Sequence, residues 1–200
     1  MKKIGAALIV LAASQTGELS SNEAHAAKAA HMTTAGRSLR PIGHAMFCQQ
    51  LPRECEVRTD DDTAPTLTRS KWRKMVLVNA RVNSAVQPVT DQEYYGVEEH
   101  WTYPDKFGDC EDYVLLKRHM LMQQGFPPSS LLITVVLQPN GDGHAVLTVR
   151  TDRGDYILDN LEGKVKAWNE TPYKYLKRQS TKHSGKWINI RDNRRKVASN

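Results

Sequence analysis

The hydrophobic pattern of this chain changes its period once, near residue 125, and this change limits the folds open to it. Before residue 125, apolar residues recur at helical spacing over two segments, 67–85 and 109–124. After it, short apolar segments are separated by turn residues, over 131–138, 144–150, 155–160, 173–180 and 186–190. Helices followed by strands with short connections indicate an α+β domain with an antiparallel sheet.

The second helical segment predicts a buried central helix. It begins at Asp109 or Cys110 and ends near Gln124, with Gly125 as the C-cap and Pro127 beyond it. Apolar residues cover much of its circumference, which is typical of a helix packed between other elements.

The first helix, 67–85, has Thr66 as its expected N-cap. Residues 86–109 then form a long loop that Pro and Gly interrupt, and loops of this length usually have a function. We expect a turn at Gly185 between the last two strands.

The first 26 residues have the three parts of a secretory signal peptide. Lys2 and Lys3 precede an apolar run over 4–13, and Ala24-His25-Ala26 supplies the small-x-small triplet that a signal peptidase recognises. The apolar run is too short to anchor the chain in a bilayer. We therefore expect cleavage after Ala26, which would leave 174 of the 200 residues.

A mature chain of this size predicts one domain, over 27–190. Its composition, with 40% apolar and 25% charged residues, is ordinary for a soluble domain. Residues 27–65 show no sustained periodicity and predict an irregular segment laid across the domain, whereas 191–200 predict a flexible basic tail. The net charge is +6, but no nucleic-acid-binding motif accompanies it, and no later segment could span a membrane.

Three cysteines in an exported chain leave one cysteine over when two are paired. Cys48 and Cys55 flank a short loop-like stretch that a disulfide could close. Cys110 then remains as an intermolecular link, a reactive thiol or a buried inert thiol. Its position favours reactivity, because unpaired N–H groups and the helix dipole at a helix N-terminus stabilise a thiolate.

A histidine and a carboxylate on neighbouring strands could complete a catalytic group with Cys110. If Asp152-Arg153 is a two-residue turn, Asp159 lies opposite Val146, and His144 lies diagonal to it on the same face. A cysteine nucleophile, a histidine base and an orienting acid form the set used in acyl-transfer chemistry. Asn160 is an alternative orienting residue.

The acidic residues around Cys110 oppose this chemistry unless their carboxylates are engaged by hydrogen-bond donors or by a cation. Negative charge beside a thiol raises its pKa. Asp109 could cap the helix, with Asp112 completing an arrangement like a capping box. Alternatively, Asp109 and Glu111 could bind a hard cation such as Ca²⁺.

Three motifs together resemble those of the bacterial transglutaminase-like cysteine proteinases. They are Gly-Asp-Cys-Glu-Asp-Tyr at 108–113, with Lys117 and Gly125 downstream, Gly-His-Ala-Val-Leu at 143–147, and Ile-Leu-Asp-Asn at 157–160. The resemblance extends from the helix around Trp72 to residue 180.

The resemblance implies a papain-like, transglutaminase-like core and a catalytic triad of Cys110, His144 and Asp159. It also implies calcium binding at Asp109 and Glu111. Known members act in the periplasm, cleave large surface adhesins and are sequestered by an inner-membrane receptor for cyclic-di-GMP. The same triad would also serve an acyltransferase or amidase, and a non-catalytic binding module could retain the fold.

Overall fold

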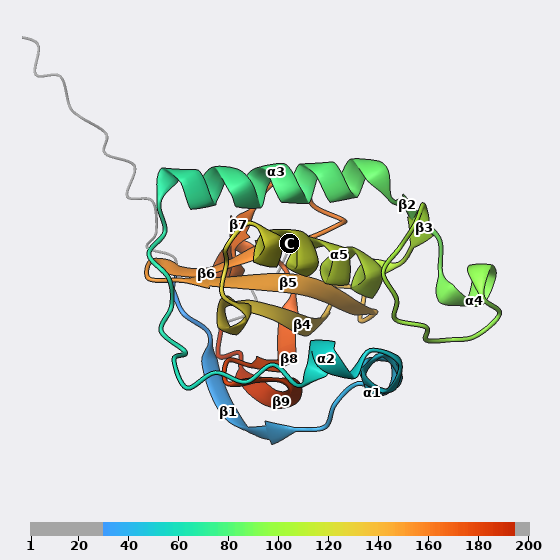
Figure 1. Cartoon of the computed structure of the whole chain (residues 1–200), viewed down its shortest axis with the longest axis horizontal. Helices are drawn as coiled ribbons and strands as arrows, with labels where there is room; N and C mark the ends of the chain where they lie inside the picture. The colour runs from blue at the N-terminus through green and yellow to red at the C-terminus, as the bar shows by residue number, and fades with distance from the viewer. Residues whose placement is uncertain (1–29, 195–200) are drawn as a thin grey trace, which may run out of the picture.

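The computed structural model describes residues 30–194 (Figure 1). The expected signal peptide and residues 195–200 lie outside this range. The helices are α1 (Ile42–Gln50), α2 (Pro52–Cys55), α3 (Arg69–Ala85), α4 (Asp91–Tyr94) and α5 (Cys110–Gln123), with 3₁₀ turns η1 (Pro128–Ser130) and η2 (Trp168–Glu170). The strands are β1 (Thr33–Ser38), β2 (Gln87–Pro88), β3 (Phe107–Gly108), β4 (Leu131–Leu137), β5 (Gly143–Thr151), β6 (Gly154–Leu158), β7 (Lys166–Ala167), β8 (Lys174–Ser180) and β9 (His183–Arg191).

Seven strands form one antiparallel sheet, in the order β1-β9-β8-β4-β5-β6-β7. The short strands β2 and β3 pair in parallel as a separate ribbon. The mixture of helices with an antiparallel sheet confirms the predicted α+β class. None of the helices between residues 30 and 194 is both long and apolar enough to cross a bilayer.

Helix α5 is the central helix, as predicted. It packs against β5 and β4 on one side, and α3 lies across its other side (Figure 1). Val114, Leu115 and Leu121 are almost fully buried between these layers. Gly125 follows the helix with a φ of 88°, a left-handed conformation that glycine adopts without the strain other residues would have.

The predicted helix 67–85 begins two residues late. Thr68, rather than Thr66, is the N-cap, and its side chain accepts a hydrogen bond from the Lys71 N–H. Leu67 lies outside the helix because its N–H donates to the Asp152 carboxylate at 2.8 Å. The expected loop 86–109 contains the short elements β2, α4 and β3.

The prediction of an irregular segment over 27–65 is wrong for residues 33–55. These residues form β1, which extends the sheet beside β9, and the helices α1 and α2. Their weak periodicity has a physical cause, because β1 is an edge strand with mostly exposed side chains and α1 exposes apolar residues such as Ile42. The Cys48–Cys55 disulfide joins α1 to α2.

The turn expected at Gly185 is also wrong, because β8 and β9 meet at Thr181-Lys182 and Gly185 lies within β9. Glycine is needed there for close packing, since a Cβ at this position would lie 2.5 Å from the backbone oxygen of Cys55. The expected flexible tail begins too early as well. Arg191 ends β9, and the Arg194 guanidinium lies over the Trp168 ring at 4.6 Å.

Candidate active site

Cys110 is the first residue of α5 and lies against β5. The Asp109 backbone before it is extended, which directs the chain from β3 into the helix. The Cys110 sulfur accepts a hydrogen bond from the Ala145 N–H at 3.3 Å. This contact places the sulfur beside the strand residue that follows His144.

His144 and Asp159 are joined by a buried hydrogen bond of 2.9 Å, between Nε2 and Oδ1. The strand register explains this contact. Leu147 pairs with Leu158 and Thr151 with Gly154, which is the predicted register of the β5–β6 hairpin. A shift by one residue would have put the two side chains on opposite faces of the sheet.

The environment of Asp159 favours its ionised form. Burial alone would raise its pKa, but hydrogen bonds from His144 and Tyr173 hold that pKa below its ordinary value. The Leu161 N–H donates a further hydrogen bond to Oδ1 at 3.0 Å. An ionised carboxylate can only accept, so the proton of neutral His144 lies on Nε2 and leaves Nδ1 as an acceptor.

Within residues 30–194, no hydrogen bond joins the Cys110 sulfur to His144. The thiol instead donates to Glu111 Oε2, at 3.1 Å. Burial raises the pKa of Cys110 well above its ordinary value, and the charge and hydrogen bond of Glu111 raise it further. This arrangement holds the sulfur as a thiol.

A group of carboxylates lies beside the cysteine. Oxygens of Asp91, Asp109 and Asp112 lie within 4.8 Å of one another, and Asp109 and Glu111 form a similar group with the Cys110 sulfur. Asp109 is the N-cap residue of α5, but its side chain makes no capping hydrogen bond. Capping therefore does not account for this carboxylate.

The oxygens of this acidic group suit a hard cation. Asp109 Oδ1 and Asp112 Oδ2 are buried without a hydrogen-bond partner in the structure described. Burial raises the pKa of Glu111 to about 9, aided by a hydrogen bond with Asp109 and its charge. Burial raises the pKa of Asp112 to about 8, aided by the charges of Asp109 and Asp91. A cation bound here would offset the repulsion between the carboxylates and would give the two unpaired oxygens a partner.

Two residues of the site leave no recognisable signal in the sequence. Asp91 lies in the first turn of α4, far from Cys110 along the chain, and the ribbon of β2 and β3, together with the hydrogen bond from the Thr102 N–H to Asp112, brings that loop back to the helix. Tyr173 precedes β8, and its hydroxyl donates to Asp159 Oδ2. Asn160, the alternative orienting residue, instead has a buried side-chain oxygen without a hydrogen-bond partner among the residues described.

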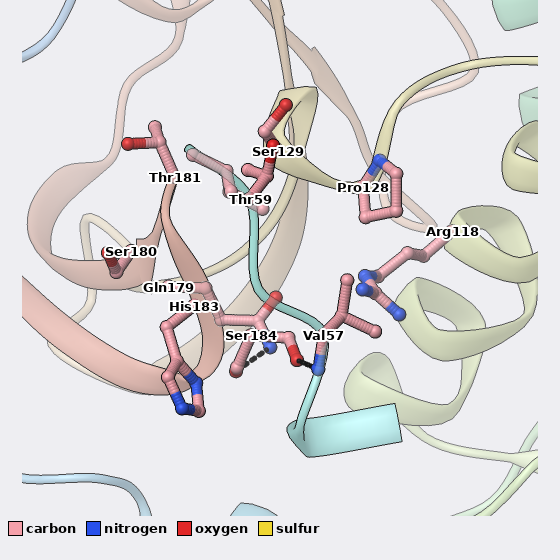
Figure 2. Close-up of a pocket in the computed structure, with 11 residues that line it drawn as sticks. Val57, Thr59, Arg118, Pro128, Ser129, Gln179, Ser180, Thr181, His183 and Ser184 are labelled. Atoms are coloured by element: carbon pink, nitrogen blue, oxygen red, sulfur yellow. Dashed lines mark hydrogen bonds between the residues drawn. The ribbon is translucent and has the colours of Figure 1, made fainter. Parts of the chain in front are cut away.

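Two pockets differ in size and position. The pocket drawn in Figure 2, between the segment at Val57, η1 and the β8–β9 hairpin, has a free volume of about 10 Å³, which is room for one water molecule. No triad candidate lines it. A larger cavity of about 230 Å³ is lined by Asp159 and Tyr173, on the carboxylate side of His144.

Comparison with known proteins identifies the family. The sequence profile described as bacterial transglutaminase-like cysteine proteinase BTLCP matches residues 34–195. No curated protein sequence matches significantly. Among solved structures, Legionella pneumophila LapG is 27% identical, with a TM-score of 0.51, over 59% of this chain and 68% of that chain.

A calcium-bound structure of Legionella pneumophila LapG is 26% identical, with a TM-score of 0.49, over 56% of this chain and 66% of that chain. An EGTA-treated structure of the same protein is 27% identical, with a TM-score of 0.49, over 56% of this chain and 64% of that chain. The present chain thus spans about two thirds of the length of these solved chains. The profile match covers most of the chain, from β1 to the end of the described residues. The chain therefore belongs to the bacterial transglutaminase-like cysteine proteinases, a family of cysteine peptidases.

Proposed function

We propose that this protein is a periplasmic cysteine endopeptidase with a triad of Cys110, His144 and Asp159. The observation that carries the proposal is the buried hydrogen bond of 2.9 Å from His144 Nε2 to Asp159 Oδ1, beside a cysteine at a helix N-terminus. Family membership supports the reaction class. The signal peptide expected over residues 1–26 supports export.

In the proposed mechanism, Cys110 first turns its sulfur from Glu111 towards the imidazole. His144 Nδ1 takes the thiol proton, and the sulfur attacks the carbonyl carbon of the peptide bond. In this mechanism, backbone N–H groups at the start of α5 donate to the oxyanion that forms. His144 then protonates the leaving amine, which departs as the acyl-enzyme forms. Water, deprotonated by His144, attacks the acyl carbon and releases the thiol.

Asp159 supports both proton transfers. Its ionised carboxylate keeps the proton of neutral His144 on Nε2, and it stabilises the imidazolium that forms when Nδ1 accepts the thiol proton. Burial of both side chains strengthens this interaction, because little water lies between them to weaken it.

Calcium fits the acidic group beside Cys110. Solved LapG structures are described as calcium-bound and EGTA-treated. We assign Asp109 and Glu111 as ligands, together with Asp91 and Asp112, because their carboxylates cluster and two of their oxygens lack partners. Bound calcium would supply positive charge that offsets the negative charge around the thiol.

The substrate we propose is a protein of the cell envelope, such as a large surface adhesin, and an inner-membrane receptor for cyclic-di-GMP is the proposed inhibitory partner. Both follow from the family resemblance. The test compares the cell-envelope proteome of cells producing the wild type or Cys110→Ala. We expect fragments of one or a few envelope proteins that require Cys110, while the variant keeps the melting temperature of the wild type.

Identical proteomes would contradict the proposed endopeptidase. Incorporation of a labelled primary amine into proteins, without cleavage, would instead indicate an acyltransferase. Because Cys110→Ala removes only the sulfur of a partly exposed residue, unchanged folding is expected, and loss of cleavage can be attributed to chemistry.

Calcium binding is tested by thermal unfolding. We expect 1 mM Ca²⁺ to raise the melting temperature by about 8 °C, as binding to the folded state alone adds about 3 kcal/mol at a hundredfold excess over Kd. Asp109→Ala should abolish the rise, whereas Asp142→Ala, at an exposed acid in the β4–β5 turn, should retain it. An equal rise in both variants would mean that calcium does not bind at this site.

A further inference from the structure

Tyr173 touches both members of the His144–Asp159 pair. Its hydroxyl donates to Asp159 Oδ2, while His144 and the Leu161 N–H both donate to Oδ1. Its ring lies 5.5 Å from the His144 ring, between centroids. Tyr173 is 8% exposed, so this hydroxyl has little access to other partners.

The loop that carries Tyr173 is held in place from the other side. Arg194 donates to the backbone oxygens of Trp168, Thr171 and Tyr173, and its guanidinium lies over the Trp168 ring. Asp192 accepts two further hydrogen bonds from this guanidinium. The tyrosine thus enters the site from a fixed backbone rather than from a free loop.

The distribution of donors over Asp159 has a consequence for His144. With Oδ2 occupied by the tyrosine, the carboxylate cannot rotate without losing a hydrogen bond, and Oδ1 stays directed at Nε2. A donor to the ionised carboxylate also disfavours its protonation. Both effects keep Nδ1 of His144 free to receive a proton from the thiol.

We propose that Tyr173 is a positioning residue for the peptidase reaction, which locks the Asp159 carboxylate and thereby the tautomer and orientation of His144. The inference rests on the proposed triad. It adds a fourth side chain, from the segment before β8, that acts through Asp159. Tyr173→Phe removes only the hydroxyl and keeps the ring against His144.

The test measures the His144 imidazole in the full chain, labelled with ¹⁵N-histidine, at neutral pH with calcium present. Wild type is expected to show one tautomer, protonated on Nε2. Tyr173→Phe is expected to show both tautomers, and its Cys110 should react with iodoacetamide about tenfold more slowly, the loss expected from one hydrogen bond to a charged group. An unchanged tautomer and an unchanged rate would overturn the inference.

Tyr175→Phe is the matched control. This variant also removes a buried tyrosine hydroxyl, two residues along the chain, but that hydroxyl bonds Thr171 Oγ1 at 2.9 Å and not the triad. It should leave the His144 tautomer and the alkylation rate as in wild type. The same changes in Tyr175→Phe would reduce Tyr173 to a structural residue and overturn the inference.

If Tyr173→Phe does not fold, the spectrum of the wild type tests the inference instead. A single Nε2-protonated form together with a slowly exchanging Tyr173 hydroxyl proton supports the inference, and mixed tautomers in wild type overturn it. Failure of the proposed function would look different. In that case the wild-type Cys110 would react no faster than an ordinary cysteine, whatever the tautomer of His144.

Discussion

Lys117 is a buried lysine of helix α5. Its side chain is fully buried, and Nζ has no hydrogen-bond partner among the described residues. Nζ lies over the Tyr113 ring, 5.7 Å from its centroid. Burial lowers the pKa of Lys117 to about 7, and the charge of Asp159 opposes that shift only in part. The charged form is therefore costly in the folded protein.

This cost predicts that Lys117→Met raises the free energy of unfolding by an amount that depends on pH. In the unfolded chain the amine titrates near its ordinary pKa of about 10.4, so between about pH 7 and 10 the unfolded state binds the extra proton and wild-type stability rises with pH. The variant should exceed the wild type by about 4 kcal/mol in free energy of unfolding at pH 7, and the difference should shrink towards pH 10.

Urea unfolding at pH 7, 8.5 and 10 measures this difference. Lys186→Met, at an exposed lysine of β9, should show no such trend. A difference between Lys117→Met and wild type that stays constant over this range would mean that Lys117 titrates normally in the folded protein.

At the scale of elements, the β5–β6 hairpin and α5 carry the triad candidates. Both could be predicted because their signals are local. A two-residue turn sets the register that brings His144 to Asp159, and apolar residues followed by Gly125 define the helix. The acidic group could be predicted only in part, since Asp91 reaches it through a loop whose course depends on the pairing of β2 with β3.

The disulfide is the covalent link within the N-terminal elements. It holds α1 to α2, and α2 packs on β9, where Gly185 permits close approach. His44 of α1 accepts a hydrogen bond from the Trp187 indole of β9 at 3.2 Å, which adds a second tie. The sequence predicted that the two cysteines could pair. It did not predict helices α1 and α2, because their stability comes from contacts with distant strands.

Replacing both Cys48 and Cys55 by alanine should lower the free energy of unfolding by about 2 kcal/mol, because the bond closes a short loop in the unfolded chain. Denaturant unfolding measures the loss. Wild type treated with a reductant should show a similar loss, and no loss in either sample would mean that the bond contributes nothing to stability.

At the scale of the whole molecule, the triad candidates and Tyr173 come from three separate parts of the chain. Helix α5 supplies the sulfur, the β5–β6 hairpin supplies the imidazole and carboxylate, and the segment before β8 supplies Tyr173. The order of the strands could not be read from the sequence. The position of β8 beside β4, and of β1 at the sheet edge, depends on long-range pairing that leaves no local pattern.

The proposed peptidase activity depends on activation of the Cys110 sulfur by His144. The direct measurement is the second-order rate of Cys110 alkylation by iodoacetamide at pH 7 with calcium, in wild type, His144→Ala and the control His119→Ala. Cys110 is the one free cysteine of the three, so labelling reports this sulfur alone. We predict a rate at least about 100-fold lower in His144→Ala, since a positioned base contributes on that order, and a wild-type rate in His119→Ala. Equal rates in wild type and His144→Ala would contradict the triad.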